Sequence, residues 1–227
     1  KKDDVIIGNM HFDTTKAHIE VRGAHAINCV TKEAFDTNSD YPFKGNIDTD
    51  KLEQLIKEYG PERIPLVMIT VTCNSGGGQP VSMENIKKTA AILKKYNIPM
   101  FFDAARFAEN AYFIRTREDA YKNVPIIQIV REMFSYANGA TMSCKKDAIV
   151  NIGGFVALNS PDLYQQCTQF CVIYEGFVTY GGLSGRDLAA IAQGLYDGID
   201  YEYLKSRIYQ TEYLGKKLRE AGVPIIW

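Results

Sequence analysis

The feature that most constrains the fold of this chain is the apolar run Leu66–Thr72, which is followed at once by a glycine-rich segment and a helical pattern. The run is continuous and rich in β-branched residues, as expected for a strand buried on both faces of a parallel sheet. Ser82 then predicts the start of a helix that extends to about Tyr96, and Ile98–Phe102 predicts the next buried strand. Strand, helix and strand in this order predict an α/β protein with a mostly parallel sheet flanked by helices.

The same alternation continues on both sides of this unit. Further strands are predicted at Ala24–Val30, at Ala140–Ser143 and, once or twice, within Ile149–Leu158. Further helices are predicted at Asp48–Tyr59, from Ala104, at Pro125–Phe134, at Asp162–Ile173 and, with breaks, over Gly185–Ala221. A chain of 227 residues is long enough for one large domain with a full hydrophobic core.

Composition argues against several classes of partner. The 26 basic and 27 acidic residues leave a formal net charge of −1 without a basic run, which argues against nucleic acid. No apolar run approaches the roughly 20 residues that span a bilayer, so no membrane partner is expected. Five cysteines without a CxxC pair are typical of a reducing compartment, and we expect the protein to be cytoplasmic. We predict that Cys167 and Cys171 pack in the core and do not bind a metal.

Three predicted strands are each followed by polar residues that suit a cofactor site. The segment 74–80 follows the first, Asp103 and Arg106 follow the second, and Ser143 and Lys146 follow the third. Ligands of open α/β sheets bind at this carboxyl edge. A lysine, an acid and an arginine are the parts that a pyridoxal phosphate site needs. Each segment alone has a simpler interpretation as a turn, a helix cap or a solvated pair of lysines.

Three long motifs make the chain resemble the β-eliminating lyases, which use pyridoxal 5'-phosphate to cleave L-tryptophan or L-tyrosine. They are Val71–Met83, Phe102–Ile114 and Met142–Phe155. Shorter agreements occur at Gly8–Thr15, Phe43–Asn46 and Tyr174–Leu183, so the resemblance covers essentially the whole chain. It implies the large domain of a fold-type I PLP-dependent transferase, similar to aspartate aminotransferase. Residues 1–222 would be the central part of that domain, and residues 223–227 would begin a small domain.

The resemblance also implies a role for each matching residue. Lys146 would carry the cofactor and take the α-proton of the substrate, while Asp103 would pair with the pyridine nitrogen. The cofactor's phenolic oxygen would lie near Arg106 and Asn74. The remaining matches are Phe12, which would stack on the ring, Ser143, which would contact the phosphate, and Asn151, which would bind a potassium ion. Glu109 follows Arg106 on its helix and either supports it or has a structural role.

The residue after Phe12 is the main basis for predicting the substrate. Tryptophan-cleaving members have Asp at this position and tyrosine-cleaving members have Thr, so Asp13 favours conversion of L-tryptophan to indole, pyruvate and ammonia. An acid there could assist proton transfer around an indole, which makes Asp13 a candidate catalytic residue. Against this, the segments 132–136, 152–155 and 185–187 resemble the enzymes that convert L-tyrosine to phenol, pyruvate and ammonia.

The family's further N-terminal and C-terminal regions cannot be located in the chain. We therefore expect the 227 residues to be part of a longer polypeptide and to lack lyase activity alone. A hypothesis of another class is a truncated, non-catalytic module that binds pyridoxal phosphate or dimerises. Because the family is tetrameric, we expect a homo-oligomer that acts on a small amino acid.

Overall fold

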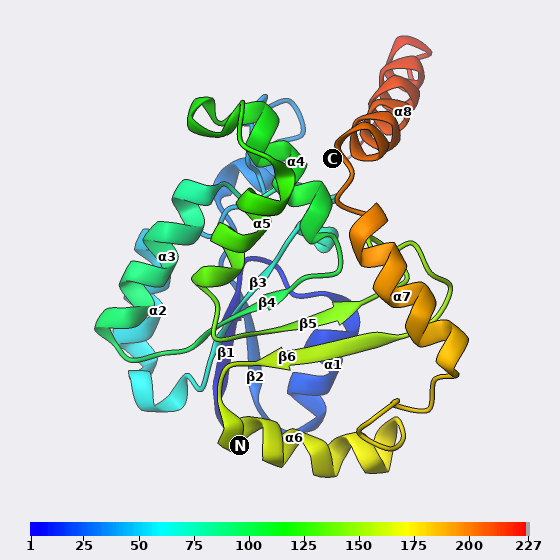
Figure 1. Ribbon diagram of the computed structural model, residues 1–227. Helices are drawn as coiled ribbons and strands as arrows, with labels where there is room; N and C mark the ends of the chain where they lie inside the picture. The colour runs from blue at the N-terminus through cyan, green and yellow to red at the C-terminus, as the bar shows by residue number, and fades with distance from the viewer. Residues whose placement is uncertain (226–227) are drawn as a thin grey trace.

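A computed structural model describes residues 1–225, and it contains a six-stranded sheet in the order β2-β1-β3-β4-β5-β6 (Figure 1). The first five strands are parallel, and β6 runs antiparallel to β5. The predicted class, an α/β large domain whose mostly parallel sheet is flanked by helices, is confirmed. The strands are β1 (Val5–Gly8), β2 (His25–Asn28), β3 (Val67–Thr70), β4 (Met100–Asp103), β5 (Gly139–Ser143) and β6 (Gly154–Leu158).

Eight α-helices connect and extend this sheet in residues 1–225. In Figure 1, α2 and α3 lie beside one another, α4 contacts both α5 and α8, and α8 projects away from the sheet. No helix among the described residues is long and apolar enough to cross a membrane. The helices are α1 (Asp13–Val21), α2 (Thr49–Tyr59), α3 (Met83–Lys95), α4 (Phe107–Arg117), α5 (Ile126–Ser135), α6 (Pro161–Tyr174), α7 (Gly185–Asp197) and α8 (Tyr201–Glu220).

Local sequence explains where several helices begin. The side chain of Asp48 accepts a hydrogen bond from the Lys51 amide, and Ser82 accepts one from Asn85 in the same way. Such side chains satisfy amides of the first turn that have no partner within the helix. The predicted starts of α2 and α3 are therefore confirmed to within a residue.

Two predicted elements differ from the structure. The helix predicted from Ala104 begins only at Phe107, because the amides of Ala104 and Arg106 bond to carbonyls of neighbouring segments instead. The strand predicted from Ile149 begins at Gly154, since Ile149 and Gly153 have positive φ angles that interrupt an extended backbone. The strand β1 was not predicted. Of the predicted small-domain start at 223–227, residues 226–227 lie outside the described residues.

The larger of two hydrophobic clusters within residues 1–225 lies between the sheet and its helices. Phe102 on β4 is fully buried, and its ring meets Phe134 of α5 edge-on at 5.6 Å between centroids. Leu52 and Ile56 of α2 are also fully buried. A Leu or Ile in such a position stabilises the fold by about 1.5–3 kcal/mol relative to an exposed one. This packing fixes the strands whose ends form the site.

The strands β1 and β3 are neighbours, although the chain passes through β2 between them. Their backbone pairing ends at Gly8 and Met68, and the Asn9 side chain continues it. Its amide nitrogen donates to the carbonyls of Thr70 at 3.0 Å and Gly45 at 2.8 Å, while its oxygen accepts from the Thr70 amide at 2.9 Å. The sheet therefore begins to open here, at its topological switch point.

Candidate active site

A cavity of about 1410 Å³ lies at the carboxyl edge of the sheet, next to this switch point. Its wall includes residues that follow β1, β3, β4 and β5, so the structure brings together the segments that were predicted to meet. Seven of the eight predicted site residues contribute to the wall, and Asp13 does not. The seven are Phe12, Asn74, Asp103, Arg106, Ser143, Lys146 and Asn151.

Lys146 lies three residues beyond β5 and is partly buried. Its Nζ donates a hydrogen bond to the Ser143 hydroxyl at 3.2 Å. Burial lowers the pKa of Lys146 from its ordinary value, and the positive charges of Arg106 and Lys145 lower it further. A larger share of neutral amine makes this lysine a better nucleophile and base near neutral pH.

Asp103 ends β4, and its carboxylate has few partners. The closest is the Ala105 amide, which donates at 3.4 Å. Burial raises the pKa of Asp103, while that amide and the charges of Lys146 and Arg106 act in the opposite direction. A carboxylate with so little compensation inside a cavity suits a ligand that brings a positively charged N–H group.

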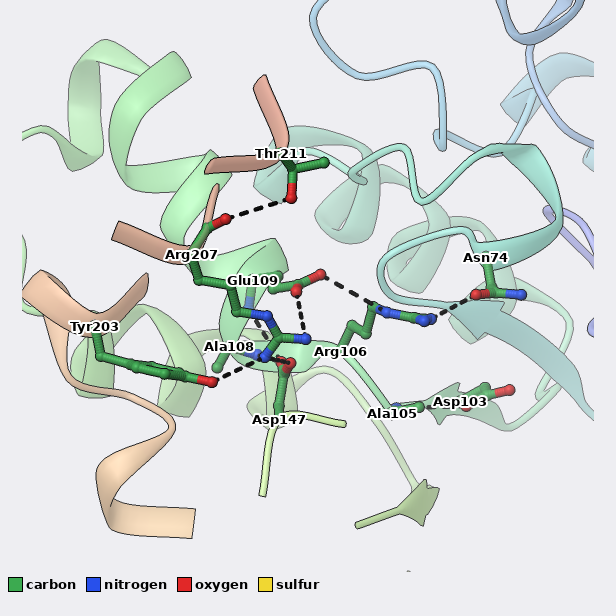
Figure 2. Close-up of polar contacts among 10 residues, drawn as sticks. All are labelled: Asn74, Asp103, Ala105, Arg106, Ala108, Glu109, Asp147, Tyr203, Arg207 and Thr211. Carbon is green, nitrogen blue, oxygen red and sulfur yellow. Dashed lines mark hydrogen bonds and ion pairs between the residues drawn. The ribbon is translucent and has the colours of Figure 1, made fainter. Parts of the chain in front are cut away.

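Arg106 and Asn74 meet across the ends of β3 and β4. The guanidinium Nη1 donates to Asn74 Oδ1 at 2.5 Å, and Nε lies 3.8 Å from a Glu109 carboxylate oxygen (Figure 2). Asn74 opens a short 3-10 turn that leads into Gly77 and Gly78, whose φ angles of 75° and 73° favour glycine. The predicted glycine-rich turn thus places Asn74 beside Arg106.

The beginning of α1 forms another part of the wall. Phe12 is half-buried and lines the cavity, as do Thr15 and the exposed His18. Asp13 is the first residue of α1, is exposed and does not contribute to the cavity lining. Its predicted catalytic role stays a prediction.

The helix α6 lines the cavity on the side of β6. Cys167 and Cys171 are partly exposed and contribute to the wall, so the prediction that they pack in the core is wrong. The reason is that α6 buries none of its residues fully and presents this face to the cavity. Asn151 is exposed and offers an amide oxygen at the edge.

Sequence reasoning missed two groups near the site. Thr72 lines the cavity and is 1% exposed, yet its hydroxyl has no hydrogen-bond partner among the described residues. Asp147, which follows Lys146 directly, is fully buried and contacts α4 and α8. The position of Asp147 directly after Lys146 is a signal that the sequence offers. The burial of its charged side chain is visible only in the structure.

Comparison with protein families matches residues 2–226 to the β-eliminating lyases. The chain belongs to the β-eliminating lyase family. The resemblance to this family that the motifs indicated is therefore confirmed, and the match extends over nearly the whole chain.

Three relatives show how the match divides between substrates. A probable β-eliminating lyase of Trichomonas vaginalis is 51% identical over 99% of this chain, a tyrosine phenol-lyase of Pasteurella multocida is 49% identical over 100%, and a tryptophanase of Salinibacter ruber is 51% identical over 99%. The chain covers 49%, 49% and 47% of these proteins, respectively. It therefore spans about half the length of the curated relatives it matches.

Solved structures agree on the fold. A SepCysS–SepCysE N-terminal domain complex matches with a TM-score of 0.60 and 15% identity, over 97% of this chain and 54% of that chain. A putative L-allo-threonine aldolase from Listeria monocytogenes matches with a TM-score of 0.58 and 15% identity, over 86% of this chain and 46% of that chain. At such low identity the likeness concerns the fold alone.

Proposed function

We propose that the chain forms the pyridoxal phosphate site of a lyase that eliminates the side chain of an aromatic amino acid. The observation that carries the proposal is that Lys146 and Asp103 share one cavity wall with Arg106 and Asn74, which are bonded to one another. Three groups fit this cofactor: the Lys146 amine of lowered pKa, the undercompensated Asp103 carboxylate, and the Thr72 hydroxyl, which has no hydrogen-bond partner within residues 1–225.

The residues that would hold the cofactor are those of the cavity wall. Lys146 would bind it covalently, Asp103 would receive its ring nitrogen, and Phe12 would stack on the ring. Arg106 and Asn74 would lie near its phenolic oxygen, while Ser143 would contact the phosphate. When bound, pyridoxal phosphate withdraws electrons from the α-carbon of an amino acid and so makes its proton removable.

The chain's own residues then move the protons. Lys146 would be the base that takes the α-proton of the substrate, and its lowered pKa favours the neutral form. Asp103 would hold a proton on the ring nitrogen by its negative charge. Asp13 lies next to Phe12 in sequence and would supply a proton to the departing side chain. Because Asp13 is exposed in the structure, a movement of α1 or of the substrate would have to bring Asp13 and the departing side chain together.

For the substrate we infer L-tryptophan, converted to indole, pyruvate and ammonia, on the basis of Asp13. The alternative is L-tyrosine, converted to phenol, pyruvate and ammonia. It is favoured by relatives called tyrosine phenol-lyase that are as similar to this chain as the tryptophanase is. A potassium ion, with Asn151 as one ligand, belongs to the same proposal.

A proposal of another class is a module that binds pyridoxal phosphate or dimerises without catalysis. In either case residues 1–222 would be the central part of the large domain, and residues 223–227 would begin the small one. For the intact enzyme we propose a homotetramer. The five free thiols support a cytoplasmic location.

The test offers pyridoxal phosphate and then L-tryptophan, L-tyrosine or an S-alkyl-cysteine to the intact protein. We expect the visible absorbance of lysine-bound cofactor, followed by release of indole and pyruvate. Lys146→Ala should lose the absorbance, and Lys145→Ala, at an exposed neighbour, should keep it. Phenol in place of indole would select the alternative substrate, absorbance without turnover would select the non-catalytic module, and no absorbance would refute the proposal.

A further inference from the structure

A group of charged side chains lies next to Arg106 (Figure 2). It consists of Glu109 on α4, Asp147 after β5 and Arg207 on α8. None of the three lines the cavity. They are far apart in sequence, so only the fold brings them together.

Asp147 links the segment that contains Lys146 to the segment that contains Arg106. One carboxylate oxygen accepts hydrogen bonds from the amides of Ala108 at 2.7 Å and Glu109 at 3.1 Å, in the first turn of α4. Its own amide donates to the Ala105 carbonyl at 3.3 Å. Arg106 precedes α4 and provides no side-chain cap, so Asp147 takes that role from another segment. Lys146 and Arg106 are thereby held at a fixed separation.

Glu109 ties Arg106 to Arg207. One carboxylate oxygen lies 2.8 Å from Arg207 Nη2, and the other lies 3.8 Å from Arg106 Nε. The second nitrogen of Arg207 lies 3.4 Å from Asp147 Oδ1. A single guanidinium therefore contacts two carboxyl groups, each of which contacts a segment of the cavity wall. Without it, these two largely buried acidic groups would lie close together without the cation that contacts both.

The neighbouring helix restricts the same segment. Gly194 of α7 lies against the carbonyl of Ala148, and Gly198, directly after α7, lies against the carbonyl of Asp147. Both contacts are so close that a β-carbon at either glycine would overlap the carbonyl oxygen. The turn between α7 and α8 thus packs directly on the residues that follow Lys146. Arg207 lies in the second turn of α8, where it reaches the carboxylates.

We propose that Arg207 is a positioning residue of the site, through which α8 holds Glu109 and Asp147 and so keeps Arg106 and Lys146 in place for the cofactor. The inference rests on the proposed function, because it assigns a consequence for pyridoxal phosphate binding. Arg207 itself touches neither the cavity nor the reacting atoms.

The test measures the dissociation constant of pyridoxal phosphate by absorbance titration of the intact protein, together with the pH dependence of that absorbance. Arg207→Met should weaken binding on the order of tenfold and shift the pH midpoint, because residues in one ion-pair network are coupled. Arg207→Lys should restore part of the affinity. Lys205→Met is the matched control, since Lys205 lies on the same helix and its salt bridge within residues 1–225 is with exposed Glu202. It should leave the affinity unchanged.

Glu109→Gln keeps the test decisive if Arg207→Met does not fold, which thermal unfolding of the cofactor-free protein would show. It should also weaken binding, and the double variant should lose no more than the weaker-binding single variant. The inference would be overturned if both Arg207→Met and Glu109→Gln kept the wild-type affinity and pH midpoint, or if their losses of affinity multiplied in the double variant. In either case the absorbance of the wild-type protein would still support the proposed function. A wild-type protein without that absorbance overturns both.

Discussion

Replacing Asp147 by asparagine should change how the stability of the protein depends on pH. Burial and the nearby Glu109 raise the pKa of Asp147 from 3.8 to about 7, against the opposing effect of Arg207 and two amides. The folded protein then binds a proton that the unfolded chain releases between these two values. Stability from this group is therefore largest below pH 3.8 and is lost as the pH rises towards 7.

The size of the effect follows from the two pKa values. The rise from 3.8 to about 7 corresponds to roughly 4 kcal/mol over the whole range, of which somewhat more than half falls between pH 5 and pH 8. The asparagine of the variant cannot titrate, but its side-chain oxygen can still accept the amides of Ala108 and Glu109. The difference in unfolding free energy between wild type and Asp147→Asn should therefore fall by about that amount across this interval.

Urea unfolding of the cofactor-free protein at several pH values measures this difference, after reversibility has been checked. Other titrating groups, such as His11 with its lowered pKa, are present in both proteins and cancel. Asp162→Asn, at an exposed residue of α6, is the control and should give a constant difference. A constant difference for Asp147→Asn, or one that grows with pH, would show that Arg207 and the amides keep the carboxylate ionised and would refute the reasoning.

Three further predictions concern packing, substrate and cation. Gly194→Ala should lower the unfolding free energy by about 1–3 kcal/mol in urea titrations, because its methyl group would overlap the Ala148 carbonyl oxygen, whereas Gly215→Ala, with open space around it, should not. Asp13→Thr should raise the ratio of kcat/KM for L-tyrosine to that for L-tryptophan, and an unchanged ratio would remove the basis for preferring tryptophan. Replacing potassium by sodium should reduce turnover in the wild type more than in Asn151→Ala, and equal reductions would exclude Asn151 as a ligand.

Much of the fold could be predicted because its signals are local. Ser82 begins α3 and Asp48 begins α2, since capping depends on residues three positions apart. The strand β3 was evident from an apolar run that is buried on both faces. In contrast, β1 offers only three apolar residues, between four charged residues and Gly8, so no apolar pattern is visible in the sequence.

The site was predictable as far as it depends on strand order. Asp103 and Lys146 both follow strands, and parallel strands bring their carboxyl ends to one edge. The partial exposure of Cys167 and Cys171 was not predictable, because a helical apolar face does not reveal whether it meets the core or a cavity. Arg207 is 60 residues from Asp147, and no local pattern in the sequence indicates that contact.

The side chain of Asn9 determines how widely the sheet opens at the cavity. It donates one hydrogen bond to the Thr70 carbonyl and accepts one from the Thr70 amide. One amide side chain therefore takes the place of one residue of backbone pairing. The gap between β1 and β3 is therefore set by a fixed covalent length and not by loop movement. A ligand that enters between the segments after these strands meets a preorganised opening, and little of its binding energy is needed to reshape the backbone there.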